Sequence, residues 1–352
     1  MDRHGTFVAR LLDSSLRGLA AEIAVRHRRR LQERGLELPA ASFDTLIADT
    51  EARLLVLGEA LATARPALFV EELEWARSAC LARDVGETGL AVNVACLREV
   101  LFAELPPSTH DALRATLEPA ERAFERPARR LEGWLDRDGP QARRLGPILL
   151  AILETRREDA LALLCAPLAE GRTPLEIECE LVGPLLAEIG AMWQRGELHV
   201  HEEHYASRIV EEALVRMRLA ARPAPSNGKS VIVGSVAGNL HDLGARIVAD
   251  HFSADGWRTL QLGANMPGED LGRAAVDFDA DLIAVSVTLA SQVRRTAALI
   301  EEVRAFCEGS APPLIVGGPP FRLVPDLWRV VGADGSADSA AGAVSEGRRL
   351  VG

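Results

Sequence analysis

Residues 236–244, VAGNLHDLG, place one histidine in a short loop between an apolar run and a helical pattern. His241 stands two positions after Asn239 and directly before Asp242. An imidazole in such a loop can offer one ring nitrogen to a metal ion, while its other nitrogen needs an acceptor that holds the ring. The alternative is a loop histidine without chemical function. The loop lacks a G-x-G-x-x-G pattern, so dinucleotide binding is disfavoured.

The elements around His241 alternate between strand and helix. Apolar and β-branched runs predict strands at 230–236, 257–263, 281–287, 312–318 and 329–334, and a helical pattern follows each of them. This alternation predicts a Rossmann-like, five-stranded parallel sheet covered by helices on both faces. Such sheets bind ligands beyond the carboxyl ends of their strands, which is where His241 falls.

The chain before residue 220 has a helical pattern almost throughout. Turn signals interrupt it at 33–42, 105–111 and 135–141. We predict an N-terminal all-helical domain over 1–138 and a four-helix bundle over 139–220, with helices at 141–156, 158–169, 174–195 and 200–220. A proline-rich linker, 221–229, then leads to the α/β domain over 230–352.

The composition excludes several classes of protein. The 352 residues, 48% of them hydrophobic, are enough for the packed cores of two or three domains. A formal net charge of -11 gives no basic field for nucleic acid, and the arginine-rich cluster at 26–30 is typical of a solvated patch. The five cysteines show no CxxC spacing and predict reduced thiols. Without a signal-peptide pattern or a long uncharged apolar stretch, we expect a cytoplasmic protein with no membrane or nucleic-acid partner.

Three segments of the predicted α/β domain resemble cobalamin-binding domains. The first, similar to the family's G-D-x-H-D-x-G loop, consists of Gly238, Asn239, Leu240, His241, Asp242, Leu243 and Gly244. Ser286 and Thr288 match the family's S-x-T after the third strand, and the pair Gly317–Gly318 matches its GG after the fourth. The resemblance implies that His241 replaces the cofactor's own lower base and ligates cobalt. It also implies that the small residues line a slot for the nucleotide tail.

Asn239 departs from the family, which has an aspartate there to hold the ligating histidine. The amide oxygen of Asn239 can still accept a hydrogen bond, but it carries no charge. We therefore expect a less electron-rich imidazole at His241 and a weaker dependence of ligation on pH.

The predicted bundle carries a second pattern, Trp193 followed after nine residues by Glu203 and His204. This W-x9-E-H pattern resembles the helical cap of adenosylcobalamin photoreceptors. The resemblance implies that the tryptophan packs over the upper ligand and that the glutamate and histidine line the same cavity. The alternatives are a core tryptophan and a solvated helix start. Gln194 stands where the light-sensing transcription factors of that family have a cobalt-capturing histidine, so water or another histidine (His199, His201 or His204) would take that role.

An all-helical unit before a cobalamin photosensor resembles the photocobilins, which pair cobalamin with biliverdin. This resemblance implies a globin-like N-terminal domain that binds the bilin, with Cys80 or Cys96 as a covalent attachment point unless both are structural thiols. A domain that binds a signalling protein and no pigment is the contrasting interpretation.

We therefore expect a light sensor that binds adenosylcobalamin and biliverdin and signals through a change of conformation. Small-molecule chromophores, light-dependent homo-oligomers and a separate signalling protein are its expected partners. The chain has no GxSxG, HExxH or Walker pattern and no room for a mutase barrel, so we do not expect an enzyme. The alternative function is a corrinoid methyl-carrier protein of a methyltransferase system, with residues 1–138 as its docking module.

Overall fold

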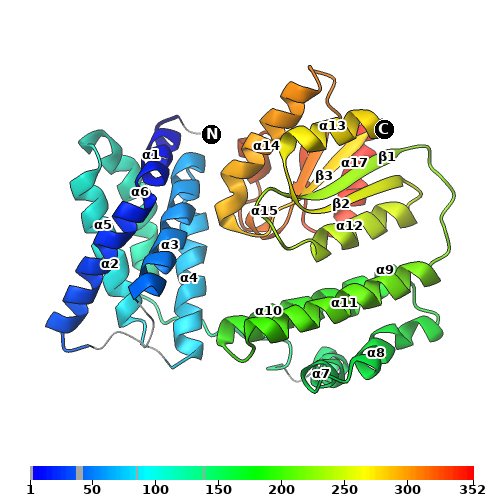
Figure 1. The fold of residues 1–352 in the computed structure, drawn as a ribbon, viewed down its shortest axis with the longest axis horizontal. Helices are drawn as coiled ribbons and strands as arrows, with labels where there is room; N and C mark the ends of the chain where they lie inside the picture. The colour runs from blue at the N-terminus through cyan, green and yellow to red at the C-terminus, as the bar shows by residue number, and fades with distance from the viewer. Residues whose placement is uncertain (1–2, 37–42, 85, 138) are drawn as a thin grey trace. The chain divides into compact units, whose positions relative to one another are not determined.

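The computed structural model describes residues 3–36, 43–84, 86–137 and 139–352 (Figure 1). The contacts divide the chain into two compact units. The larger unit comprises Met1–Arg77, Val85–Ala128 and Ser226–Gly352, and the smaller unit comprises Ser78–Asp84 and Arg129–Pro225. The predicted turn at 33–42 lies largely outside the described residues, as does the predicted boundary at residue 138.

The larger unit contains an all-parallel sheet with its strands in the order β2-β1-β3-β4-β5. The strands are β1 (Ser230–Val236), β2 (Arg258–Met266), β3 (Leu282–Ser286), β4 (Leu314–Gly317) and β5 (Gly335–Ala337). The predicted Rossmann-like, five-stranded parallel sheet is thereby confirmed. In this strand order the winding of the chain reverses between β1 and β3. A ligand crevice therefore belongs beside the carboxyl ends of those two strands.

Helices cover both faces of the sheet (Figure 1). They are α12 (Leu243–Ala254), α13 (Gly268–Phe278), α14 (Val293–Phe306), α15 (Pro319–Leu323), α16 (Leu327–Val331) and α17 (Ala340–Val351), with the 3₁₀ turn η3 (Ala290–Gln292) before α14. Neighbouring β1 residues point to opposite faces: Val231 packs with α12 and α17, and Ile232 packs with α13 and α14.

The predicted strand at 329–334 is wrong. The first half of this range, residues 329–331, lies in α16, where Leu327 and Val331, one helical turn apart, are both buried. Gly332, with φ +86°, ends this helix in the left-handed conformation. The last strand, β5, has the sequence GSA, which contains no apolar run that a pattern could detect.

The rest of the larger unit is helical, and we call it the helical part, in contrast to the α/β part over residues 226–352. Its helices are α1 (Arg3–Ser14), α2 (Leu16–Glu33), α3 (Phe43–Thr63), the first part of α4 (Ala67–Ala82), α5 (Thr88–Glu104) and α6 (His110–Ala123), with the 3₁₀ turn η1 (Pro107–Thr109). One apolar core joins the two parts, because α3 residues such as Leu57 and α14 residues such as Val293 belong to the same cluster. The globin-like arrangement stays a prediction.

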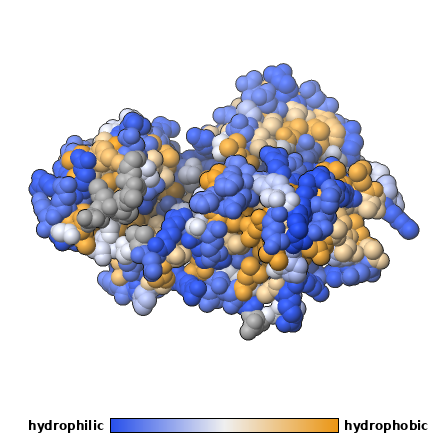
Figure 2. Space-filling view, turned by 60° about the horizontal axis from the view of Figure 1, so that its bottom comes forward, coloured by the Kyte–Doolittle hydropathy of each residue, from blue (hydrophilic) through white to orange (hydrophobic). Residues whose placement is uncertain are grey.

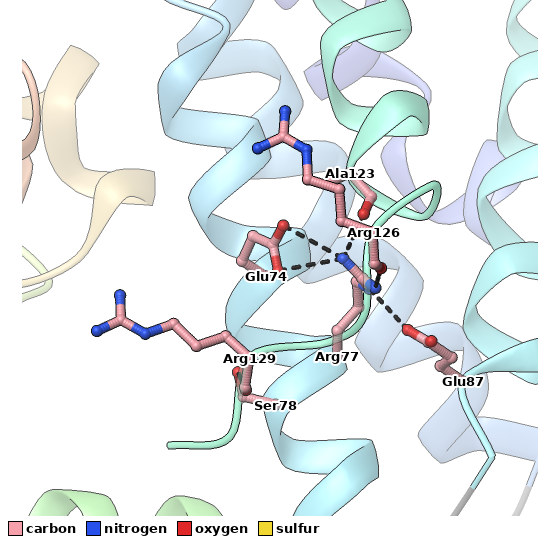
Figure 3. Close-up of polar contacts among 7 residues, drawn as sticks. All are labelled: Glu74, Arg77, Ser78, Glu87, Ala123, Arg126 and Arg129. Atoms are coloured by element: carbon pink, nitrogen blue, oxygen red, sulfur yellow. Dashed lines mark hydrogen bonds and ion pairs between the residues drawn. The ribbon is translucent and has the colours of Figure 1, made fainter. Parts of the chain in front are cut away.

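Arg77 holds the helical part together from its interior (Figure 3). The side chain lies on α4 and is fully buried. Its guanidinium donates to the carboxylates of Glu87 (2.7 Å) and Glu74 (3.2 Å). It also donates to the main-chain oxygens of Ala123 and Arg126, both at 2.5 Å. These two oxygens lie at and beyond the end of α6, so one side chain ties α4 to the carboxyl end of α6.

The smaller unit contains the predicted bundle, which we call the cap. Its helices are α7 (Pro140–Leu153), α8 (Arg157–Ala169), α9 (Pro174–Ile177), α10 (Gly183–Arg195) and α11 (Val200–Ala220). A π-helical turn, η2 (Glu178–Val182), joins α9 to α10 without a break, so the predicted third helix at 174–195 is one helical run with a π bulge.

No described helix is both long and apolar enough to cross a membrane. On the face drawn in Figure 2, hydrophobic residues are interspersed with hydrophilic ones.

Candidate functional site

His241 lies in the loop between β1 and α12, at the carboxyl edge of the sheet. The loop turns at Gly238, whose φ of +80° is in the left-handed region that favours glycine. Ser235 donates its hydroxyl to the carbonyl oxygen of His241 (3.2 Å). Asn239 is fully buried, whereas Leu240 is 77% exposed and His241 is also exposed. A leucine and an imidazole therefore stand at the surface, next to the switch point between β1 and β3.

The partners of Asn239 determine how its amide is oriented. Nδ2 donates to the carbonyl oxygen of Ser286 (3.3 Å) and to Oγ1 of Thr288 (3.2 Å). Because a carbonyl oxygen can only accept, Oδ1 is the atom that faces His241. Oδ1 accepts from the backbone N of His241 (3.1 Å) and lies 3.2 Å from its Nδ1. In the neutral ring this contact places the proton on Nδ1 and leaves the lone pair of Nε2 for a metal ion.

Two further polar residues hold the loop, and sequence reasoning missed them. Asn265, in β2, accepts from the backbone N of Gly238 (2.7 Å), and its own backbone N donates to the carbonyl oxygen of Asn239 (3.0 Å). Gln292 donates Nε2 to the carbonyl oxygen of Gly238 (3.3 Å). Both residues contact main-chain atoms, which are the same in every residue, so no sequence motif in the loop indicates these contacts. The signal that could have found Gln292 is a glutamine three residues after Leu289, at the third position of a helical turn, where its side chain accepts from the backbone N of Leu289.

The other two predicted segments meet the loop at the same edge. Ser286, at the end of β3, pairs with Ser235 of β1 on one side and with Gly317 of β4 on the other. Gly318, with φ +120°, lies so close to the carbonyl oxygen of Val287 that no Cβ would fit there. The structure thus brings the segments around residues 238–244, 286–288 and 317–318 together.

Asp242, Leu243 and Gly244 begin α12 beside this edge. Asp242 is the N-terminal capping position of the helix, and Leu243 is its first residue. A Cβ placed on Gly244 would meet only Oγ of Ser286, at 3.9 Å. This is an ordinary van der Waals distance, so the first turn of α12 leaves room for about one methyl-sized group beside the end of β3.

Trp193, in the last turn of α10, is 39% exposed, whereas its neighbour Gln194 is buried. Arg195 anchors this turn through ion pairs with Glu188 (3.2 Å) and Glu197 (2.7 Å). Glu188 is itself fully buried and accepts from the backbone N of Trp134. The exposed indole of Trp193 thus lies at a helix end that the buried ion pair of Arg195 and Glu188 holds in place. Gln194 points into the packed interior of the cap.

Glu203 and His204 lie in the first turns of α11, which packs against α10. His204 Nδ1 is 2.6 Å from Oε2 of Glu203, and Oε1 of Glu203 accepts from Ser207 (2.8 Å). The rings of His199 and His201 stack with centroids 5.8 Å apart at the start of the same helix. The structure joins Glu203 to His204 and places Trp193 at the end of the preceding helix. These three residues belong to the smaller unit and His241 belongs to the larger one.

Family comparisons match both regions. Residues 229–345 match a family described as "B12 binding domain", and residues 146–217 match a second family of the same description. The chain contains a cobalamin-binding domain. Its cofactor is a cobalt corrinoid, and the cap accompanies the domain as a helical B12-binding unit.

Curated relatives fall into two kinds. The chain is 27% identical over 169 residues to a corrinoid protein of Desulfitobacterium hafniense, covering 47% of this chain and 77% of the relative. It is 29% identical over 186 residues to the HTH-type transcriptional repressor CarA of Myxococcus xanthus, covering 52% of this chain but only 60% of the repressor's length. Among solved structures, the Methanosarcina barkeri monomethylamine corrinoid protein matches with a TM-score of 0.53 and 17% identity, over 60% of this chain and 99% of that one. This last likeness shows a shared fold.

The residues at the sheet edge fit a corrinoid. The exposed His241 has its Nδ1 committed to Asn239, so Nε2 can serve as the cobalt ligand. The neighbouring Leu240 offers exposed apolar surface to a large flat ring. A Cβ on Gly244 would have only Oγ of Ser286 within 4 Å, so a group fits beside this glycine, whereas Gly317 and Gly318 let the chain pack against the main-chain oxygens of Ala337 and Val287. Cobalt supplies the coordination chemistry when the cofactor is bound, and the chain supplies one imidazole ligand and the slot around it.

Proposed function

We propose that this protein is a light sensor that binds adenosylcobalamin in the base-off form, with His241 as the lower ligand. The bound cofactor supplies a cobalt–carbon bond that light can break. The loop over residues 238–244 holds His241 in one tautomer, through the amide of Asn239. By the resemblance to adenosylcobalamin photoreceptors, Trp193, Glu203 and His204 would contact the adenosyl group, the upper ligand of the cofactor.

Trp193 carries this proposal. A tryptophan that only stabilises a helical bundle is buried on average, because its large ring contributes most when removed from water. Trp193 instead keeps 39% of its surface exposed on a helix end anchored by Arg195 and Glu188. A rigidly held, exposed indole is suited to pack on a flat apolar group such as adenine. The similarity to the repressor CarA over 186 residues also supports the proposal.

The variant Trp193→Ala tests the proposal. In the dark, we expect its affinity for adenosylcobalamin to fall about tenfold, with methylcobalamin affinity much less affected, because the indole packs on the larger upper ligand. After green light, we expect the wild type to form a product with a stable absorption spectrum. In the variant, the absorption spectrum should keep changing after illumination. Trp75→Ala is a matched control, because Trp75 is 42% exposed and lies on α4 in the helical part. Unchanged adenosylcobalamin affinity and photoproduct stability in Trp193→Ala would remove the sensor proposal.

Biliverdin is the proposed second pigment. A cleft of about 570 Å³ within the larger unit is lined by Leu16, Leu55 and Leu289 and by the guanidinium of Arg295. Asp13, Glu59 and Arg294 also line it, and the two carboxylates pair with Arg294. Its volume lies within the range usual for ligand pockets, and a cationic group beside apolar walls suits a tetrapyrrole with propionates. A red absorption band after incubation with biliverdin, lost in Arg295→Ala, would support this assignment. If no red band appeared, the helical part would instead be interpreted as a domain that binds a protein partner.

We propose that the signal leaves the protein through a light-dependent change in homo-oligomeric state or through a separate signalling protein, and that the chain is not itself an enzyme. Interfaces between subunits suit such a signal, because they switch between discrete packings.

The second candidate function is a corrinoid methyl carrier. It is favoured by the similarity to a corrinoid protein of Desulfitobacterium hafniense, 77% of which this chain covers. It predicts tight methylcobalamin binding and no stable photoproduct. The absorption experiment described for Trp193→Ala therefore separates the two functions.

A further inference from the structure

The carboxylate of Glu59 caps α14 by accepting from a backbone N that lies 235 positions later in the chain. Glu59 lies on α3 of the helical part and is 2% exposed. Its Oε2 accepts from the backbone N of Arg294 (2.8 Å), and its Oε1 lies 3.1 Å from Nε of Arg294. Arg294 is the second residue of α14, so this N–H has no acceptor within its own helix. A negative charge at this end also complements the helix dipole.

Asp13 completes the cluster from a second helix of the helical part. Its carboxylate receives both terminal nitrogens of Arg294, at 2.6 and 3.1 Å. α1 and α3 therefore both hold the first turn of α14, next to the apolar core that the two parts share. A movement of α3 relative to the α/β part would therefore displace the first turn of α14.

Gln292 connects the same turn to the cofactor loops. It stands directly before α14 and is 4% exposed. Its Oε1 accepts from the backbone N of Thr288 (3.1 Å) and of Leu289 (3.0 Å). Its Nε2 donates to the carbonyl oxygen of Gly238 (3.3 Å). One buried amide thus holds both the segment after β3 and the loop after β1.

From Thr288 the contacts continue to the proposed cobalt ligand. The hydroxyl of Thr288 accepts from Nδ2 of Asn239 (3.2 Å), and Oδ1 of Asn239 holds the ring of His241. The contacts run without a gap from Glu59 through the start of α14 to His241. Asn239 and Gln292 are buried and Thr288 is half-buried, whereas Gly238 and His241 at the end of the route are exposed. Buried polar groups keep their hydrogen bonds because an unpaired one is costly.

We propose that Glu59 is a positioning residue for His241, acting through the first turn of α14 and Gln292. The helical part thereby controls how firmly the imidazole is presented to cobalt. This inference rests on the proposed function only for the role of His241 as lower ligand, and it holds for a sensor and a methyl carrier alike.

Asp326 provides a matched control. It forms an ion pair of 2.5 Å with Arg65, which follows α3, and it directly precedes α16. This pair also joins the helical part to the α/β part, but it lies on a segment that makes none of the contacts from Glu59 to His241. Asp326→Asn therefore weakens the attachment of the two parts without touching the proposed route.

The experiment uses the full chain loaded with cob(II)alamin in the dark, with electron paramagnetic resonance as the readout. Nitrogen splitting from an axial imidazole separates the His-bound from the water-bound form, and His241→Ala gives the water-bound reference. In Glu59→Gln, we expect the ratio of His-bound to water-bound cobalt to fall about tenfold, because the amide keeps the shape but loses the charge at the helix end. Asp326→Asn should stay within about twofold of the wild type.

Gln292→Ala is the second variant, which keeps the test decisive if Glu59→Gln fails to fold. It should lower the same ratio, and in the double variant the two effects should not add, because both act on one route. Equal effects of Glu59→Gln and Asp326→Asn, or full additivity with Gln292→Ala, would overturn the inference. A wild-type spectrum without nitrogen splitting would instead overturn His241 as the ligand, and the inference would fall with it.

Discussion

Arg77 and Arg294 each pair with two carboxylates. In the Arg77 cluster the arginine is the buried residue, whereas in the Arg294 cluster the most deeply buried residue is the glutamate, Glu59. The side chain of Arg77 is fully buried, and those of Glu74 and Glu87 are 32% and 39% exposed. In the second cluster the carboxylate of Glu59 is 2% exposed, whereas the side chain of Arg294 is 18% exposed. An arginine keeps its charge at any pH at which a protein folds, but a glutamate does not.

This difference in burial gives the two clusters different roles: the Arg77 cluster acts as a constant structural brace, and the strength of the Glu59–Arg294 contact can change. The charge of Arg77 is constant, and its acceptors all lie within the helical part, so it can only hold that part together. The charge of Glu59 depends on its surroundings, and its partner Arg294 lies in the α/β part. The first cluster should therefore govern stability, and the second should govern communication between the two parts.

Arg77→Met should cause the largest loss of stability. It removes a buried charge that is bonded to two carboxylates and two main-chain oxygens, and such losses cost about 3–5 kcal/mol. Chemical denaturation measures the loss, and hydrogen exchange should place it at the carboxyl end of α6. Cobalt ligation by His241 should stay unchanged in this variant.

Arg29→Met is the control for that experiment. Arg29 is 79% exposed and pairs with Glu33 one turn later on α2, so its loss should leave the denaturation midpoint unchanged. If Arg77→Met were as stable as this control, Arg77 would not be the brace described above.

The α/β part shows how far sequence patterns reach. Four of its strands have apolar runs, and the predicted ranges overlap β1 to β4. β5 has only small residues, so a search for apolar runs selects the nearby pair Val330–Val331, which lies in α16. Loop motifs placed residues 238–244, 286–288 and 317–318 at one edge, because parallel strands end together.

The contacts between distant segments could not be predicted. Glu59 and Arg294 are single charged residues within helical patterns rich in charge, and no spacing rule links positions 235 apart. Likewise, Gln292 and Asn265 hold the loop through main-chain atoms, which accept any suitable donor or acceptor. Sequence reasoning finds residues that a cofactor must contact. It misses residues that hold those contacts in place.

Glu59 should make stability depend on pH. Burial, opposed by Arg294 and reinforced by the nearby Asp13, raises the pKa of Glu59 to about 7. A carboxyl whose pKa is higher in the folded than in the unfolded chain stabilises the fold fully below its unfolded pKa of about 4.5 and loses that contribution as the pH rises through about 7. A shift of this size corresponds to about 3 kcal/mol.

Denaturation of the wild type and Glu59→Gln between pH 5 and pH 8 checks this prediction. The stability of the wild type relative to Glu59→Gln should fall as the pH rises, because the amide cannot ionise. A relative stability that grew with pH would mean that the ion pair with Arg294 outweighs burial, and the cluster would then resemble that of Arg77.

Asn239→Asp should have the smallest effect on stability and the most local one. The NH₂ group of Asn239 donates to the carbonyl oxygen of Ser286, and a carboxylate cannot, so we expect a loss of about 1 kcal/mol. The same carboxylate would accept a charge-assisted hydrogen bond from Nδ1 of His241 and make the imidazole a stronger ligand. The His-bound fraction of cob(II)alamin should therefore rise while the denaturation midpoint falls slightly.

Asn265→Asp separates the added charge from the contact with the imidazole. Asn265 accepts from the backbone N of Gly238 in the same loop, so the substitution adds the same charge nearby. It should leave the His-bound fraction close to that of the wild type. If both aspartates raised that fraction equally, the loop would act through its overall charge, and the contacts from Glu59 to His241 would matter less than the field around the cobalt. If only Asn239→Asp raised it, ligation would depend on the one amide at which those contacts end.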